Sequence, residues 1–294
     1  KNEINASRAL PDGFLARPIM ANQHGLLTGN ARAFARLFRS TTDCLGLDLD
    51  NIVEDHNNAG FAGLIIHSSP VTLVDVHRLQ GWAKTINHDR VLVTIPDAPS
   101  SVLSYIEEIA AFRKLKEENP ELQEDPVALK ELNARQEGIS LSLEDAFSNL
   151  TDAGPTGPNW WWKGERHPVS NRKAMNRLLS GVADQVYPKA PIIQNELVNR
   201  SHLPSAVVIA VKKIVDGLLN GAGDETLGFE GNGPEVSIFK TVFERTGIYR
   251  NHGQTRQLAP PQSQNPANLG PTWETIEEFL KGAGSAERKL SELV

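Results

Sequence analysis

Basic side chains that follow a run of aromatic rings are the residues of this chain whose types and spacing point most directly to a chemistry. Trp160, Trp161 and Trp162 are consecutive, and several cations follow them. Tryptophan rings can stack on nucleobases, while lysine and arginine neutralise phosphates. The pattern therefore predicts a nucleic-acid site, against the alternative that the tryptophans anchor the segment to a core or an interface. The candidate contact residues are Lys163, Arg166, Arg172, Lys173, Arg177, Lys212 and Lys213.

Charge is distributed unevenly along the chain. The 294 residues carry a formal net charge of −6. Residues 101–150 contain 11 acidic and five basic residues, whereas residues 160–215 contain nine basic and three acidic residues. The second segment therefore favours DNA binding, although the whole chain is acidic. An alternative hypothesis is a protein-interaction module with no DNA role, in which the acidic segment docks on a basic partner.

A second candidate site lies where an apolar run ends. Leu64–Ile66 predicts a buried strand, and His67 and Ser68 follow it directly. Ligands of α/β proteins bind at the carboxyl ends of such strands. A small-molecule enzyme with a site near His67 is therefore a further alternative. The competing interpretation is that His67 is a hydrogen-bonded structural residue.

Motifs for metals and nucleotides are weak or missing in the sequence. No phosphate loop of the form G-x-x-x-x-G-K-[ST] occurs, and Gly228–Gly233 fits turns rather than dinucleotide binding. We assign no catalytic, cofactor-binding or metal-ligating residue, and whether the chain is an enzyme stays open. Cys44 is expected to be a buried apolar thiol. One acidic stretch suits either the binding of a divalent cation or the polar start of a helix. It contains Asp48, Asp50, Glu54, Asp55 and His56.

The first hundred residues are expected to form an α/β unit. Leu64–Ile66 and Arg90–Ile95 read as buried strands, and residues 71–86 read as the helix between them. Strand, helix and strand over this length predict a parallel crossover. The apolar residues of the segment 31–37 recur at helical spacing, which predicts a short helix there.

The remaining chain is expected to be mainly helical. Residues 101–153 predict a charged helical arm, in which Asp125 caps a helix that begins at Pro126. Residues 159–253 predict a helical or winged-helix-like module, and residues 254–294 a linker and a terminal helix. The expected fold class is an α/β N-terminal part followed by a mainly α part.

Several short runs in the second half carry a resemblance to a known family. They resemble a block of the very large P-loop ATPases of bacterial phage-defence systems, namely the BREX-type ATPase component and related phosphorothioation-linked restriction ATPases. The resemblance covers about residues 90–280. It implies a parent protein that binds ATP with magnesium and acts in defence on or near DNA, without placing an ATP site or a catalytic residue in this chain. The runs are Asn195–Arg200, Leu203–Ser205, Leu227–Glu235, Ile238–Phe239 and Thr246–Ile248.

These observations together predict a non-catalytic fragment of a large anti-phage defence ATPase that serves DNA engagement or subunit assembly. The chain begins at Lys1 and shows no terminal signal, from which we expect a piece of a longer polypeptide. The partners to expect are DNA, other defence-system subunits and a further copy of the chain. No apolar run has the length of a membrane span and no secretory leader is visible, so we expect a cytoplasmic protein without a membrane partner.

Overall fold

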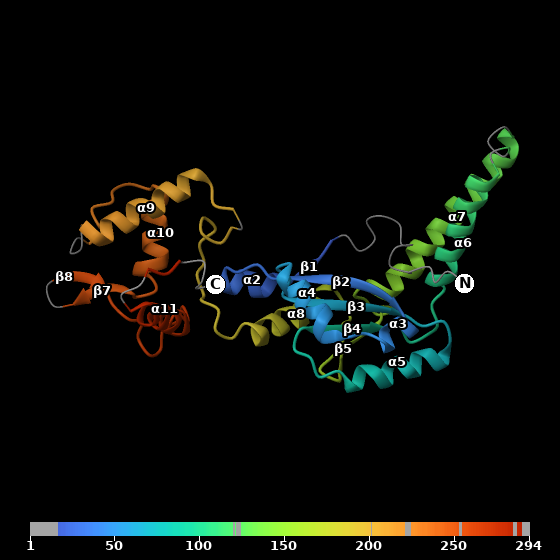
Figure 1. The fold of residues 1–294 in the computed structure, drawn as a ribbon, viewed down its shortest axis with the longest axis horizontal. Helices are drawn as coiled ribbons and strands as arrows, with labels where there is room; N and C mark the ends of the chain where they lie inside the picture. Colours follow the sequence, from blue (N-terminus) through green and yellow to red (C-terminus); the bar gives the residue numbers. More distant parts are fainter. Residues whose placement is uncertain are drawn as a thin grey trace. The chain divides into compact units, whose positions relative to one another are not determined.

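The computed structural model describes residues 17–119, 121, 125–200, 202–220, 225–252, 255–284 and 287–289. The chain forms two compact units, the first containing residues up to 21 together with residues 32–186, and the second containing residues 22–31 together with residues 187–294. The first unit is an α/β structure with a mixed sheet and the second is mainly helical, which confirms the expected fold class (Figure 1).

A six-stranded sheet organises the first unit. Its strands follow one another in chain order, and only the central three run parallel, since β1, β5 and β6 pair antiparallel with their neighbours. The parallel centre is built by two crossovers, as expected for consecutive apolar strands joined by helices. The strands are β1 (Ile19–Met20), β2 (Ala33–Ser40), β3 (Gly63–Ser69), β4 (Val91–Ile95), β5 (Asn159–Trp162) and β6 (Glu165–His167).

The crossover helices contribute to an apolar core with the sheet. The β2–β3 connection contains α3 (Thr41–Leu45) and α4 (Leu49–Asn58), and α5 (Leu73–Thr85) joins β3 to β4. A capping box starts α5, because Thr72 Oγ1 accepts the Asp75 backbone N–H while the Asp75 carboxylate accepts the Thr72 N–H. The buried side chains in this core include Ala35, Leu64, Ile66, Val76, Leu79, Val91, Val93 and Ile95.

Two long helices form the expected arm between β4 and β5. Figure 1 shows α6 (Val102–Glu118) and α7 (Pro126–Thr151) side by side, running away from the sheet. Asp125 Oδ1 accepts the backbone N–H groups of Val127 and Ala128, so the predicted cap of α7 is confirmed. The base of the arm is anchored in a core, where Phe38 packs with residues such as Leu143 and Phe147.

Two sequence expectations for the first unit differ from the structure. The expected helix over residues 31–37 is wrong, because residues 33–37 lie in strand β2. Phe34 and Phe38 are spaced by four residues, a spacing that suits one face of a strand as well as one face of a helix. The expected boundary before residue 159 also differs, since the first unit extends to Val186. It extends that far because β5 pairs with β4, and α8 (Arg172–Val186) completes the unit.

Helices and a short hairpin make up the second unit. A buried cluster joins Val207, Ala210 and Ile214 of α9 to Phe239 and Tyr249. The β7–β8 hairpin follows the helical segment, and β8 lies within the stretch that was expected to be a linker. The elements are α2 (Asn22–Thr28), α9 (Ser205–Asn220), α10 (Pro234–Ile238), the π-helical turn η2 (Phe239–Glu244), β7 (Tyr249–His252), β8 (Thr255–Leu258) and α11 (Gly270–Ala283).

Candidate nucleic-acid interface

Four of the predicted cations follow one another on β6 and at the start of α8. Arg166 lies on β6, and Arg172 and Lys173 are the first two residues of α8, where Arg177 follows one turn later. All four side chains are exposed. Lys173 and Arg177 are four residues apart and therefore lie on the same face of the helix. None of the four makes a hydrogen bond or an ion pair with another residue in the described part of the chain, so their charges are available to an external anion.

The position of these cations on α8 is electrostatically unusual. Asn171 Oδ1 accepts the Ala174 backbone N–H at 2.9 Å and so caps the helix. The N-terminus of a helix carries a partial positive charge, which favours acidic side chains in the first turn. The first turn of α8 contains no acidic residue and begins with two cations instead. The arrangement costs stability locally and provides the positive potential that a phosphate group would neutralise.

Lys163 and Lys213 are already paired within the protein. The Lys163 ammonium forms an ion pair with Asp89, donates to Gln185 Oε1 at 3.1 Å and lies 5.2 Å from the centroid of the Trp162 ring. Lys213 Nζ lies 2.9 Å from Glu235 Oε1, and this hydrogen bond is the main reason that the pKa of Glu235 is lowered. Both lysines therefore offer less charge to a ligand than the unpaired candidate cations do.

Lys212 completes the predicted set. It is exposed on α9 and belongs to the second unit together with Lys213, whereas the other five candidates belong to the first unit. Of the five candidates in the first unit, the four on β6 and α8 are those without a partner among the described residues, and these four form the candidate interface.

The three tryptophans do not form an exposed stacking platform. Trp160 and Trp161 are buried in strand β5, which pairs with β4. Trp162 is partly exposed, and its Nε1–H donates to the Asp89 carbonyl oxygen at 3.0 Å. The interpretation that the tryptophans anchor the segment to a core thus holds for Trp160 and Trp161, and base stacking is left to Trp162 alone.

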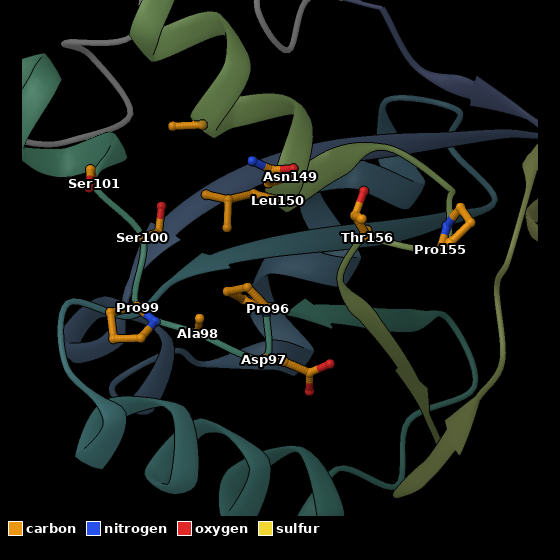
Figure 2. A pocket seen from close by; sticks show the side chains of 12 residues that line it. Pro96, Asp97, Ala98, Pro99, Ser100, Ser101, Asn149, Leu150, Pro155 and Thr156 are labelled. Atoms are coloured by element: carbon orange, nitrogen blue, oxygen red, sulfur yellow. The ribbon is translucent and has the colours of Figure 1, made fainter.

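Two adjoining pockets lie beside the candidate interface. The first, of about 440 Å³, is formed by the loop that follows β4, the end of α7 and the loop before β5 (Figure 2). The second, of about 360 Å³, is lined by Arg166 and His167 and shares Asp97 with the first. Asp97 Oδ1 accepts the Asn159 side-chain amide at 2.5 Å. Asp97 is not among the residues predicted from the sequence, although its place just after a buried strand is a usable signal.

His67 and Ser68 are completely buried within β3. Arg36 Nε donates to His67 Nε2 at 3.1 Å, so the proton of the neutral ring lies on Nδ1, which contacts Thr94 Oγ1 at 2.8 Å and the Leu150 carbonyl oxygen at 3.2 Å. Burial, and secondly the charge of Arg36, lower the pKa of His67 to about 3. Neither residue lines the two pockets above, so the geometry favours the structural interpretation of His67.

The acidic segment near Cys44 has a local structural role. Asp48 Oδ1 accepts the Asn51 backbone N–H at 3.2 Å and caps α4, which agrees with a polar helix start. Among the described residues, no group of three or more histidine, cysteine or acidic side chains is arranged to hold a metal ion. Cys44 is buried as expected, and burial raises the pKa of its thiol to about 12.

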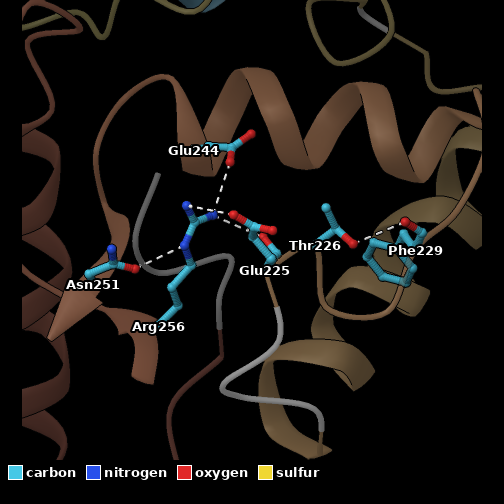
Figure 3. Close-up of polar contacts among 6 residues, drawn as sticks. All are labelled: Glu225, Thr226, Phe229, Glu244, Asn251 and Arg256. Carbon is cyan, nitrogen blue, oxygen red and sulfur yellow. Dashed lines mark hydrogen bonds and ion pairs between the residues drawn. The ribbon is translucent and has the colours of Figure 1, made fainter. Parts of the chain in front are cut away.

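Arg256 is a further polar residue that the sequence did not indicate. Its guanidinium lies between two carboxylates, 3.1 Å from Glu244 Oε1 and 3.6 Å from Glu225 Oε1 (Figure 3). Its Nε also donates to Asn251 Oδ1 at 3.0 Å. These contacts connect the β7–β8 hairpin to η2 and to the turn at Glu225. Glu225 and Glu244 neutralise the charge of Arg256 within the second unit, so Arg256 is not part of the candidate interface.

Comparison of the chain with protein-family models, with curated proteins and with solved structures found no match. Within the described ranges, no helix combines the length and the apolar character needed to cross a bilayer.

Proposed function

We propose that this chain is a non-catalytic, DNA-engaging piece of a larger nucleotide-driven machine of bacterial phage defence. The observation that carries the DNA role is the group of four exposed cations on β6 and α8 without an acidic partner among the described residues. The parent machine and its defence role rest on the resemblance of the second half to the defence ATPases.

The proposed contact is made to the phosphate backbone. Lysine and arginine side chains, and the N-terminus of a helix, bind phosphates without reading base sequence. Arg166, Arg172, Lys173 and Arg177 supply these groups, whereas the paired Lys163 contributes less. The expected binding is therefore salt-dependent and only weakly selective for sequence.

Reversing two of these charges tests the proposal. The double variant Arg172→Glu/Lys173→Glu is titrated against a fluorescent DNA duplex and a fluorescent single strand at several salt concentrations. We expect the variant to bind at least about tenfold more weakly at low salt, because two phosphate contacts become repulsive. The slope of log affinity against log salt should also flatten, by about 0.9 for each lost duplex phosphate contact.

A matched control separates the local contact from the change in net charge. The variant Lys84→Glu/Lys130→Glu also reverses two exposed lysines, one at the end of α5 and one on α7. Its net charge equals that of the α8 variant, and we expect it to keep more of the affinity. Equal affinity of the α8 variant and the unmodified chain at low salt would contradict the DNA role.

A further inference from the structure

Helix α9 has apolar side chains on two sides. Val207, Ala210 and Ile214 are buried in the core of the second unit. A second set, at successive spacings of three, four and four residues, is exposed to solvent. Val208 is 41% exposed, Val211 37%, Val215 48% and Leu219 75%. We call these four residues the α9 stripe.

The α9 stripe has the geometry of a helix–helix seam. Residues spaced by three and four lie above one another on a helix, since successive residues are rotated by about 100°. Such a seam is what two helices bury when they pack side by side. Contiguous exposed apolar surface is uncommon in soluble monomers and marks interaction sites. The stripe is therefore a docking surface whose occupant has to be apolar along the same length.

Two charges beside the α9 stripe indicate what that occupant is. Lys212 and Asp216 are both exposed, and they are four residues apart on the same flank of the stripe. Lys213, in contrast, is paired with Glu235. Neither Lys212 nor Asp216 makes a hydrogen bond or an ion pair with any residue that the structure describes. The flank thus presents one positive and one negative charge in a fixed order.

We propose that a second copy of this chain docks on the α9 stripe, with the two α9 helices antiparallel about a twofold axis near residue 213. Val211 then lies opposite Val215 of the partner subunit, and Val208 opposite Leu219 of the partner subunit. The same flank of both helices meets in this arrangement, so Lys212 lies opposite Asp216 of the partner subunit. Symmetry forms the reciprocal ion pair as well.

The charges select this arrangement over a parallel one. In a parallel pair, opposite flanks of the two helices meet, and Lys212 and Asp216 would have no counterpart across the seam. In the antiparallel pair, each helix supplies both the positive charge of one ion pair and the negative charge of the other. This self-association goes beyond the proposed DNA contact, which involves different residues in the other unit.

The first test is the oligomeric state of the full chain by sedimentation velocity over a range of concentrations. We expect a monomer–dimer equilibrium, and Val215→Asp should weaken dimerisation by at least about a hundredfold, because a charge is buried at the centre of the seam. The control Leu26→Asp changes an equally apolar, exposed side chain of α2 and should leave the equilibrium unchanged. A wild-type chain that stays monomeric up to about 100 µM overturns the proposal.

The second test exploits the symmetry of the ion pairs. Lys212→Glu places two like-charged pairs across the twofold axis, and so does Asp216→Lys, so each variant alone should dimerise about tenfold more weakly. A mixture of the two variants restores attraction in both pairs and should form the heterodimer at near wild-type affinity. Failure of the mixture to recover would exclude the antiparallel seam.

The DNA contact and the α9 seam can be tested independently of each other. Arg172→Glu/Lys173→Glu should leave the dimer intact, because both residues belong to the first unit and the α9 stripe belongs to the second. Loss of dimerisation in Val215→Asp with unchanged DNA affinity of the monomer would support the seam alone. Loss of DNA affinity in the α8 variant with an intact dimer would support the DNA contact alone.

Discussion

At the scale of single residues, a buried histidine joins the arm to the sheet. His67 accepts from Arg36 through Nε2 and contacts both Thr94 and the Leu150 carbonyl oxygen near the end of α7. Burial also lowers the pKa of Arg36, an effect that the charge of Asp152 partly offsets. A protonated His67 would present a second N–H to the Arg36 guanidinium, so the network requires the neutral ring.

The pH dependence of stability follows from this network. The pKa of His67 is about 3 in the folded chain and about 6.5 when the histidine is exposed to water, so below pH 6.5 the unfolded chain binds more protons. The contribution of the neutral, buried His67 to the free energy of unfolding is complete above pH 6.5. It is lost as the pH falls toward 3. We expect His67 alone to lower the free energy of unfolding by about 2 kcal/mol between pH 7 and pH 5.

Urea unfolding of wild type and His67→Gln at both pH values measures this difference. Glutamine cannot titrate, so the variant should be less stable at pH 7 and should lose less stability on acidification. If both proteins show the same loss between pH 7 and pH 5, His67 is not the group responsible.

At the scale of elements, the sequence predicts those whose signals are local. The apolar runs identify β3 and β4, and the Asp125–Pro126 cap identifies the start of α7. The sequence predicts a helix in place of strand β2 because Phe34 and Phe38 satisfy the periods of both a helix and a strand. Strand β5 has no such local signal, because its tryptophans also suit a binding site and the strand with which they pair, β4, lies far back in the chain.

The candidate interface shows the same limit of sequence reasoning. The basic residues were found from composition, but whether each is free depends on partners distant in the chain. Lys163 is neutralised by Asp89, and Lys213 by Glu235. The α9 stripe, in contrast, can be predicted from the sequence. Helix α9 has apolar residues on two sides, and a single core covers only one of them.

The start of α8 allows binding and stability to be separated. Arg172→Glu/Lys173→Glu replaces cations by acidic residues in the first turn, where the helix dipole favours negative charge. We expect the free energy of unfolding to rise by about 1 kcal/mol while DNA affinity falls. Lys84→Glu in the last turn of α5 should lower stability by the same principle. If the α8 variant is instead less stable than wild type, its weak DNA binding results from unfolding and not from lost phosphate contacts.

At the scale of the whole molecule, the two units are not consecutive in the chain. Residues 22–31 belong to the second unit, although the first unit contains sequence on both sides of them. Ile193 donates its backbone N–H to the Thr28 carbonyl oxygen at 3.0 Å, and Gln194 Nε2 donates to the carbonyl oxygens of Leu26 and Leu27. The helix α2 is therefore a structural part of the second unit.

A truncation experiment tests the contribution of this segment. A chain of residues 187–294 should unfold at a lower temperature and less cooperatively than the same chain with residues 22–31 joined through a flexible linker, because Ile193 and Gln194 lose their partners. Thermal unfolding followed by circular dichroism compares the two. Identical transitions would show that α2 adds nothing to the stability of the second unit.

The discontinuous second unit also has a consequence for synthesis on the ribosome. Residues 22–31 emerge early, yet their partners at Ile193 and Gln194 emerge only after the entire sheet and arm have been translated. Leu26 and Leu27 are exposed even in the complete chain, so what the segment lacks while it waits is its hydrogen-bond partners. A premature stop before residue 187 would thus release a first unit in which the backbone carbonyl oxygens of Leu26, Leu27 and Thr28 lack the donors that the complete chain supplies.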